Sequence, residues 1–244
     1  MRAQNVDWTI WQQPAVASEF ADRRSSVPGT AAQLDIMRRL IGRVPGEAVR
    51  VFDLGCGDGF LLAEVMKQCE VSLAVALDGS EPMLQRARHR FGGDERVRFV
   101  HANFNLPHWR NELPASEFDV IVSGFAIHHS ENQRKRELYE ELFGLLAPGG
   151  VFINIEHVAS SSPLGEDLWL HAWAEYDVAY RRAQGEQIDH AAAVQEHRAS
   201  EQKAANRLAP VETQLQWLRD IGFSDVDYYW KYLELAVLAG RRRT

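Results

Sequence analysis

The sequence predicts an α/β protein built on a doubly wound, mostly parallel sheet. Between residues 49 and 156, short and almost wholly apolar segments alternate with longer segments whose apolar residues have helical spacing. Strands that are covered by helices on both faces have this apolar character. In addition, a glycine-rich turn, DLGCGDG at residues 53–59, joins the first strand to the next helix, where such sheets bind nucleotide-like ligands.

The elements of this core follow one another in a regular order. Residues 30–43 form a helix ahead of it, and Pro45 and Gly46 end that helix. The core strands are predicted at residues 49–54, 73–77, 96–101, 118–123 and 151–156. The intervening helices are predicted at residues 59–67, 82–91 and 133–147, the last one closed by a Pro-Gly-Gly sequence.

The alternation stops in residues 163–206, which read as two inserted helices. Apolar or aromatic residues recur at every fourth position of the first helix, and two tryptophans stand beside this row. The pattern predicts an amphipathic helix with an aromatic stripe; the row is Leu164, Leu168, Ala172, Tyr176 and Tyr180, and the residues beside it are Trp169 and Trp173. A second, mostly polar helix begins near Asp189. Two interpretations stay open: the stripe packs on the core only, or the helices form a lid that also lines the ligand pocket.

The chain closes with a helix and a pair of strands. The helix covers residues 211–220 and ends at Gly222, and strands follow at residues 226–230 and 233–239. The sequence therefore predicts four parts: an N-terminal helical segment (1–48), a cofactor-binding α/β core (49–162), a helical insertion (163–208), and the final helix and strand pair of the core (209–244).

Composition excludes several classes of partner. The net charge of −7 argues against binding nucleic acid through a broad basic face. No segment has the roughly 20 apolar residues that a membrane-spanning helix needs. The first residues lack the apolar run of a signal peptide, and the two cysteines form no CxxC pair. We therefore expect a cytoplasmic protein with no membrane partner, and a homodimer is compatible with the sequence.

The charge of the glycine-rich turn restricts its ligand. The turn carries Asp53 and Asp58 and has no lysine or arginine, whereas a pyrophosphate favours bare amides without a central carboxylate. Gly55 and Gly57 allow close approach of the backbone. The expected ligand is therefore nucleoside-like, cationic and free of phosphate. Asp78, at the end of the second strand, then binds two ribose hydroxyls, although an acid at a strand end also serves as a turn or helix cap.

Five motifs in order, DLGCGDG, LDGSEPML, HANF, FDVIVSGFAIHHS and LLAPGGVFINIEH, resemble those of the class I S-adenosylmethionine-dependent methyltransferases. The resemblance extends over residues 49–157. It implies a Rossmann-like sheet of seven strands whose last strand is antiparallel. It also implies S-adenosyl-L-methionine as the cofactor and S-adenosyl-L-homocysteine as the product, which agrees with a cationic nucleoside.

The same resemblance implies which residues bind the cofactor. Asp53 and the amides near Gly55 and Gly57 hold the methionine part, and Asp78 holds the ribose. The other implied positions, beside the adenosine or on the floor of the site, are Gly79, Met83, Asn103, Phe104, Ser123, Gly124, Phe125 and His128. Arg23 or Arg24, just before VPG, is a candidate for binding the cofactor carboxylate. Asn103 stands where the family commonly has an acid, but an amide carbonyl still accepts a hydrogen bond from the adenine amine.

A narrower resemblance lies outside the core. RRSSVPG, VETQLQWLRDIGF and the position of the helical insertion resemble the carboxy-S-adenosylmethionine synthases. Those enzymes have an arginine that anchors the extra carboxylate, where this chain has Trp217, and they carry DLGCSLG in place of DLGCGDG. The sequence therefore indicates the ordinary methyl donor on a related architecture.

The acceptor and the catalytic groups are less constrained, because methyl transfer needs alignment and exclusion of water more than a particular side chain. His128 follows the fourth strand, and Glu156 and His157 end the fifth. All three are candidate bases, although His128 also suits a loop cap or a cofactor contact. We predict no metal site. The candidate acceptor pocket is aromatic and consists of Trp169, Trp173, Tyr176, Tyr229 and Trp230.

We therefore expect a methyltransferase that acts on a small aromatic or apolar acceptor by in-line displacement. The alternative is an enzyme like the carboxy-S-adenosylmethionine synthases, or one linked to tRNA modification. Methylation of a protein or nucleic acid and a non-catalytic cofactor-binding role are further alternatives. The intact DLGCGDG turn argues against the non-catalytic role, and SGFAIHH replaces the NPPY-like tetrapeptide of amino-methylating nucleic-acid enzymes.

Overall fold

A computed structural model of the chain describes residues 8–24 and 27–244 and contains one seven-stranded sheet in the order β3-β2-β1-β4-β5-β7-β6. The strands are β1 (Val49–Leu54), β2 (Val71–Asp78), β3 (Val97–His101), β4 (Phe118–Gly124), β5 (Leu146–His157), β6 (Ser224–Tyr232) and β7 (Leu235–Arg241). β1 to β5 are parallel, and β7 pairs antiparallel with both β5 and β6. The predicted fold class, including the antiparallel last strand, is confirmed.

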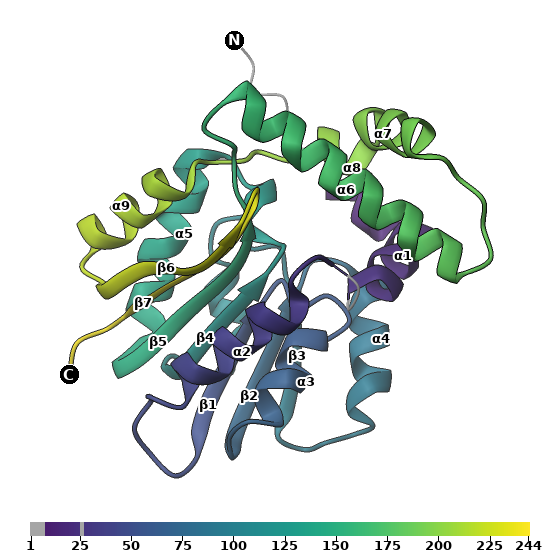
Figure 1. Ribbon diagram of the computed structural model, residues 1–244. Helices are drawn as coiled ribbons and strands as arrows, with labels where there is room; N and C mark the ends of the chain where they lie inside the picture. Colours follow the sequence, from purple (N-terminus) through teal and green to yellow (C-terminus); the bar gives the residue numbers. More distant parts are fainter. Residues whose placement is uncertain (1–7, 25–26) are drawn as a thin grey trace.

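Helices cover both faces of the sheet (Figure 1). One layer contains α2 (Thr30–Ile41), α3 (Phe60–Met66) and α4 (Glu81–Phe91). The other contains α5 (Asn132–Leu145) and α9 (Val211–Ile221). In β1 the buried side chains alternate between the layers: Val51 packs in the cluster with Met37 and Leu62, whereas Phe52 packs in the cluster with Tyr139. Burial of each large apolar side chain contributes roughly 1.5–3 kcal/mol, which explains why the strand sequences are apolar throughout.

The helix boundaries differ from the predicted ones by one or two residues, and one of these differences has a clear physical cause. The helix expected at residues 133–147 ends at Leu145, because Leu146 and Ala147 are already extended and begin β5. Pro148 disfavours the helical conformation for the residue before it, so the helix cannot continue to Ala147. Leu146 instead pairs with Phe118 of β4.

The insertion forms a helical hairpin over the carboxyl edge of the sheet (Figure 1). It consists of α6 (Pro163–Ala183) and α7 (His190–Ala199), followed by the short α8 (Glu201–Ala204). Each long helix has an N-cap, since Ser162 Oγ accepts from Gly165 N at 3.2 Å and Asp189 Oδ1 accepts from Ala192 N at 2.8 Å. The hairpin has its own small apolar cluster of Leu170, Ala174, Ala193 and Val194.

The structure corrects which stripe of α6 faces inward. Leu164 and Leu168, which begin the predicted stripe, are 68% and 51% exposed. Trp169 and Trp173, which the prediction placed beside that row, instead form with Asp177 and Arg181 an adjacent stripe that lines a cavity beneath the helix. Both stripes have helical spacing, so only the docking position of the helix distinguishes them.

The N-terminal part of the chain lies across the same edge of the sheet. It contains η1 (Trp8–Gln12) and α1 (Pro14–Arg24). Gln12 Nε2 donates to Gly79 O at 2.5 Å, and Ser80 Oγ donates to Trp11 O at 2.6 Å. These bonds hold η1 over the ends of the first strands. Within the described residues, no helix is both long and apolar enough to cross a membrane.

Candidate active site

A small cavity of about 100 Å³, termed here the cofactor cleft, opens at the carboxyl ends of β1, β2 and β4. The predicted cofactor residues that line it are Gly55, Gly57, Asp78, Gly79, Met83, Asn103, Phe104, Gly124 and Phe125. Three residues of the N-terminal segment, Trp11, Gln12 and Phe20, form its outer wall. The sheet thus brings together four short motifs that are far apart in the sequence.

Asp78 is held rigidly at the end of β2. Its Oδ2 accepts from Gly57 N at 2.8 Å, and its Oδ1 accepts from Ser80 N at 2.7 Å. Burial raises the pKa of this carboxyl, while the two amide donors favour its charged form. The N-cap of α4 is Ser80, whose Oγ accepts from Met83 N at 3.4 Å. Each carboxylate oxygen accepts from one amide and has a further lone pair, so the two oxygens of Asp78 can also accept bonds from a pair of hydroxyls.

The glycine turn uses its glycines for backbone geometry. Gly55 and Gly57 have φ of +67° and +55°, values that favour glycine. A Cβ on Gly55 would overlap the Cβ of Ala126, whereas one on Gly57 would meet nothing within 4 Å. Asp58 is structural, since its carboxylate accepts from Phe60 N at 3.2 Å and pairs with Arg90. Asp53 is fully buried behind the turn and does not line the cleft.

The charge of the cofactor cleft fits a cationic nucleoside. Among the described residues, those that line the cleft include no lysine or arginine and a single carboxylate, that of Asp78. A phosphate-bearing ligand favours amide donors or cations and is repelled by such a carboxylate. S-adenosylmethionine has a positive sulfonium, two ribose hydroxyls and no phosphate, so these residues fit it.

A second cavity of about 410 Å³, termed here the acceptor cavity, lies beneath α6 and α7. The two cavities share four lining residues: Trp11, Phe20, Phe125 and His129. Phe125 has φ of +54°, which is rare for a bulky residue, and its amide donates to Ile155 O at 2.8 Å. Strained backbone of this kind concentrates at functional sites, and here it marks the junction of the two cavities.

His128 lies on the wall of the acceptor cavity and is paired with a buried acid. Its Nδ1 lies 2.7 Å from Glu156 Oε1, so Nδ1–H donates to the carboxylate and Nε2 carries the lone pair. Glu156 also accepts from Asn154 Nδ2 at 3.1 Å and from His157 N at 3.0 Å. Burial, reinforced by the charges of His157 and Lys135, lowers the pKa of His128 well below its ordinary value. The imidazole is therefore neutral near pH 7 and able to accept a proton.

A buried polar chain extends behind this pair. Asn154 Nδ2 also lies 3.3 Å from Tyr139 Oη, which donates to Gln214 Oε1 at 2.6 Å. Gln214 Nε2 in turn donates to Ala209 O at 3.1 Å. Glu156, Asn154, Tyr139 and Gln214 are all completely inaccessible to solvent. Such a network is costly unless its members are paired, and here it fixes the orientation of Glu156 and therefore of His128.

A second histidine–acid pair faces the same cavity. His157 Nε2 lies 2.9 Å from Glu234 Oε2, and Ser160 Oγ donates to Glu234 Oε1 at 2.7 Å. The rings of His128 and His157 are 5.7 Å apart at nearly a right angle. On its other side, His157 Nδ1 lies 3.5 Å from Asn206 Nδ2.

The segment that returns from the hairpin contacts all three histidines of this cluster. Arg207 N donates to His128 O at 2.8 Å, His129 Nδ1 lies 3.4 Å from Ala205 O, and Asn206 contacts His157 as above. The buried Lys135 holds the segment from below through Arg207 O, and burial lowers its pKa to about 8.

The inward stripe of α6 forms the roof of the acceptor cavity. Trp169 lies 5.4 Å from the ring of His157 and 5.5 Å from that of Trp173. At the far end, Asp177 pairs with Arg23 of α1 and, at 3.2 Å, with Arg181. The roof is therefore aromatic near the histidines and ionic where α1 meets α6.

Comparisons with known proteins agree with this geometry. A family model described as a methyltransferase domain matches residues 51–150. A demethylmenaquinone methyltransferase of Clavibacter sepedonicus is 31% identical over 195 residues, which are 78% of this chain and 71% of that protein. The chain is a class I S-adenosylmethionine-dependent methyltransferase.

Other relatives of this methyltransferase differ in how much they cover. An uncharacterized methyltransferase of Mycobacterium bovis is 36% identical over 132 residues, so the match spans 54% of this chain and only 61% of that relative. A carboxy-S-adenosyl-L-methionine synthase of Wolinella succinogenes is 27% identical over 93% of this chain and 91% of its own length. An O-methyltransferase family protein of Burkholderia thailandensis has the same fold, with a TM-score of 0.64 at 17% identity over 96% of this chain and 62% of that one.

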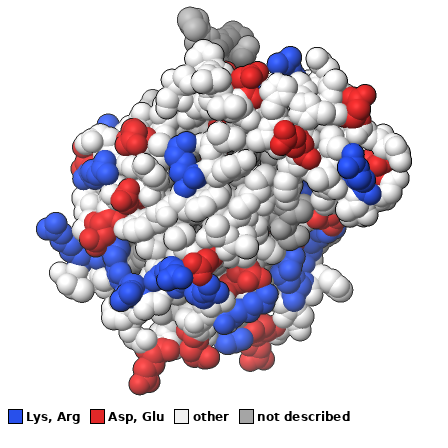
Figure 2. Space-filling view, viewed as in Figure 1, with Lys and Arg blue, Asp and Glu red and all other residues white. Residues whose placement is uncertain are grey.

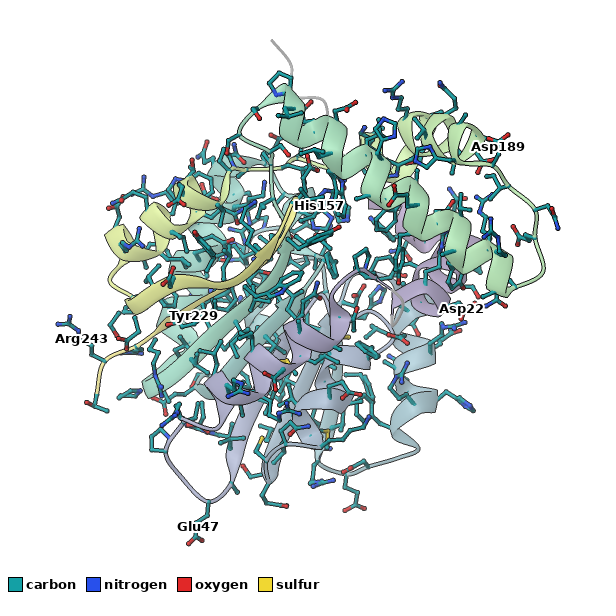
Figure 3. All side chains as sticks on the ribbon, in the orientation of Figure 1. Asp22, Glu47, His157, Asp189, Tyr229 and Arg243 are labelled. Carbon is teal, nitrogen blue, oxygen red and sulfur yellow. The ribbon has the colours of Figure 1, made fainter. Side chains whose placement is uncertain are left out.

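Only some residues of the predicted acceptor pocket lie together in the structure of this methyltransferase. Trp169 and Trp173 line the acceptor cavity, and Tyr176 stands beside Trp173 without lining it. The prediction that Tyr229 and Trp230 belong to the acceptor pocket is wrong, because both lie on β6 and line neither cavity. Figure 3 shows His157 beneath α6 and Tyr229 at the outer edge of the sheet. Trp230 instead packs against Gly29 in the α2 layer.

The remaining predicted positions lie close to the site without lining it. Ser123 is fully buried and donates from Oγ to Leu54 O at 2.8 Å, which ties β4 to β1. Glu156 lies behind His128, whereas His128 and His157 line the acceptor cavity. Arg24 ends α1, and its side chain falls outside the described part of the structure.

Several functional residues were not predicted. Glu234 lies in the turn between β6 and β7, and Asn206 lies in the segment after α8, so neither belongs to a recognisable motif. Phe20 lines both cavities although it precedes the core by many residues, and its aromatic character is the one sequence signal for it.

Proposed function

We propose that this methyltransferase methylates a hydroxyl group of a small aromatic acceptor by in-line displacement. The observation that carries the proposal is the His128–Glu156 pair on the wall of the acceptor cavity, with the neighbouring His129 and Phe125 at the junction with the cofactor cleft. When bound, S-adenosylmethionine supplies an electrophilic methyl group on a positively charged sulfur. Asp78 is suited to hold the ribose of that cofactor, and the backbone near Gly55 and Gly57 to approach the methionine part.

His128 acts on the acceptor as a general base. Its Nε2 would accept the hydroxyl proton as the acceptor oxygen takes the methyl group and the bond between that methyl group and the sulfur breaks, and Glu156 would stabilise the resulting imidazolium. Glu156 keeps its place because Asn154 and the amide of His157 donate to it. A positioned base of this kind contributes typically about 10²–10⁴-fold to the rate.

The walls of the acceptor cavity supply orientation and exclude water. A volume of about 410 Å³ is within the range of small-molecule sites. Trp11, Trp169 and Trp173 present aromatic surfaces to the acceptor, while α6 and α7 cover the cavity. Alignment of the reacting atoms in a dry site provides much of the acceleration that methyl transfer requires.

The surface charge favours a small acceptor over nucleic acid. Figure 2 shows most of the lysine and arginine of this face in its lower half, interspersed with acids, and only scattered basic side chains in its upper half. Several are paired with neighbouring acids, such as Arg39 with Asp35 at 2.7 Å and Arg88 with Glu81 at 2.7 Å.

A donor-turnover screen tests this proposal. Formation of S-adenosylhomocysteine is measured with phenols, aryl amines and aryl carboxylates in separate reactions. We expect turnover with phenols and loss of that turnover in His128→Gln, which keeps the size and polarity of the side chain. Turnover with amines or carboxylates alone, or full activity of His128→Gln, would contradict the assigned base.

The alternative is a function like that of the carboxy-S-adenosylmethionine synthases, which the similarity over 93% of this chain favours. Mass spectrometry of the ligand that copurifies with the protein separates the two. The ordinary cofactor supports methyl transfer, and a carboxylated form supports the alternative.

A further inference from the structure

We infer that the acceptor carries a carboxylate group, and that Lys203 binds this group at the mouth of the acceptor cavity. The inference rests on the proposed function, because it specifies the substrate class of the same cavity. It gives Lys203 a role in selecting the acceptor and no part in removing the hydroxyl proton.

The charged side chains that line the acceptor cavity do not balance. Among the described residues, they are three cations and two acids: Arg23, Arg181, Lys203, Asp177 and Glu196. Asp177 pairs with Arg23 and, at 3.2 Å, with Arg181. Glu196 accepts from Arg181 Nη2 at 2.6 Å. Lys203 forms no ion pair with the side chains that the structure describes, so the cavity keeps one positive charge that no acid neutralises.

The histidines of the cavity leave this balance unchanged near pH 7. Burial lowers the pKa of His128 and of His129 well below the ordinary value. Burial, together with the charge of Lys203, lowers the pKa of His197 to about 4. These three imidazoles are therefore neutral, and His157 lies 2.9 Å from a carboxylate that matches any charge on its ring.

Lys203 stands at the mouth of the cavity, near the wall that holds the histidines. Its side chain lines the cavity and is also exposed. Its carbonyl accepts from Asn206 N at 3.1 Å, and Asn206 in turn contacts His157. Lys203 and His128 thus contribute to one cavity of about 410 Å³. An aromatic acid that fills this cavity can present its hydroxyl group to His128 and its carboxylate to Lys203.

Two neutral polar side chains lie near Lys203 in the lining of the cavity. Ser200 Oγ accepts from Lys203 N at 3.2 Å, so its hydroxyl proton is available to another acceptor. The neutral His197 has one N–H, and its pKa responds to the charge of Lys203, so these two groups are near each other. A carboxylate has several lone pairs and can accept from an ammonium and from neutral donors together. A phosphate group, with a charge of about −1.5 to −2, exceeds the single unmatched positive charge.

The carboxylate should contribute to binding more than to the chemical step. Hydrogen bonds to charged groups are stronger than those between neutral groups, so we expect kcat/KM for an aromatic hydroxy acid to exceed that for its neutral amide by about 10-fold. The difference should lie mainly in KM, because the carboxylate is remote from the reacting oxygen in both the ground state and the transition state. Added salt should reduce the preference, since Lys203 is exposed.

The test compares acids with their amides, which have nearly the same size and no charge. The acids are para-hydroxybenzoate, para-hydroxyphenylacetate and para-coumarate, which differ in the separation of the hydroxyl group from the carboxylate. For each acid and its amide, kcat/KM is measured with S-adenosylmethionine, and the Kd is measured by calorimetry in the presence of S-adenosylhomocysteine. The wild-type protein should prefer at least one acid over its amide by about 10-fold.

Three variants assign that preference to a residue. Lys203→Gln should reduce the ratio of acid to amide to below about 2-fold by raising KM for the acid, whereas Lys203→Arg keeps the charge and should keep most of the ratio. Lys231→Gln removes an equally exposed charge on β6, which lines neither cavity, and should leave the ratio unchanged. The Kd for S-adenosylmethionine should stay constant in all three, because neither lysine lines the cofactor cleft.

The outcomes separate this inference from the proposed function. Equal kcat/KM for every acid and its amide overturns the carboxylate assignment and leaves phenol methylation in place. A preference that survives in Lys203→Gln, or that Lys231→Gln loses to the same extent, overturns the role of Lys203. Acids that bind more tightly than their amides but are not methylated support the carboxylate site and overturn the proposed function. If none of these compounds is bound or methylated, both proposals are overturned.

Discussion

The cofactor cleft and the acceptor cavity lie side by side but are built from different parts of the chain. The cleft is lined by short motifs at strand ends that include four glycines, and Asp78 is the single charged group among the described residues that line it. The cavity is lined by side chains from α1, α6, α7 and the segment around Asn206, and its walls include His128, His157 and an ionic end formed by Arg23, Asp177 and Arg181. We therefore expect the strand-end motifs to bind the donor and the side chains of the helices to select the acceptor.

This difference means that the two regions respond differently to substitution. A change at the cleft should alter binding of S-adenosylmethionine and leave acceptor selection unchanged. A change in the cavity should alter turnover and acceptor selection at constant cofactor affinity. Each of the following predictions tests one side of that separation.

The largest effect is expected for His128→Gln. Loss of the general base should lower kcat with a phenolic acceptor by about 10²–10⁴-fold. The Kd for S-adenosylmethionine, measured by calorimetry, should stay within about 2-fold of the wild-type value because His128 does not line the cleft. A parallel loss of cofactor affinity would show that the two regions are not separable at this residue.

Asp78→Ala should have the next largest effect, on the cofactor side. It removes a charged acceptor of two ribose hydrogen bonds, and bonds to charged groups contribute about 1.5–3 kcal/mol, so the Kd should rise at least about 10-fold and toward 100-fold. Calorimetric titration with S-adenosylmethionine measures this directly. Asp220→Ala, on the outer surface of α9, is the control, and unchanged tight binding by Asp78→Ala would remove the ribose assignment.

Tyr139→Phe should lower the stability of the protein more than it changes the binding of the cofactor or the acceptor. It leaves Gln214 Oε1 without its donor in a fully buried position, which costs about 1–3 kcal/mol of unfolding free energy. Denaturant unfolding measures the change, and Tyr228→Phe on the exposed face of β6 is the matched control. If Tyr139→Phe lowered the free energy of unfolding no more than Tyr228→Phe does, the buried hydrogen-bond chain behind Glu156 would not contribute to stability.

The smallest effect is a displacement of the pH profile. The proton-accepting form of His128 exists above its pKa, so the rate should rise with pH through that pKa and then level off. Since burial lowers this pKa well below 6.5, kcat should already be level at pH 6.5 and fall only under more acidic conditions. If the rate were half-maximal at or above pH 6.5, its rise with pH would come from the titration of a group other than His128.

The contrast between the two regions also explains what the sequence could predict. The cleft was recognisable because DLGCGDG and LDGSEPML are contiguous and their function depends on backbone geometry, which glycine and aspartate reveal directly. The strands were recognisable because burial on both faces leaves few polar residues in them.

The acceptor cavity was less predictable for equally physical reasons. The partners of the two histidines, Glu156 and Glu234, are separated by 78 residues in sequence number, and only the pairing of β5 with β7 brings them together. Trp169 and Leu168 are neighbours in the same helix, yet one is buried and the other exposed, since docking of α6 selects the inward stripe. Tyr229 and Trp230 lie at the sheet edge, which the sequence pattern does not reveal.

The contact between Gly55 and Ala126 restricts which substitutions this site can accept during evolution. A side chain on Gly55 would occupy the space of the Ala126 methyl group, so the first turn and the end of β4 meet with no room between them. An enlargement at either position therefore requires a reduction at the other, and Gly55 already has the smallest residue available. Variation here is confined to Ala126, and a glycine there is the one exchange that relieves the contact rather than tightening it.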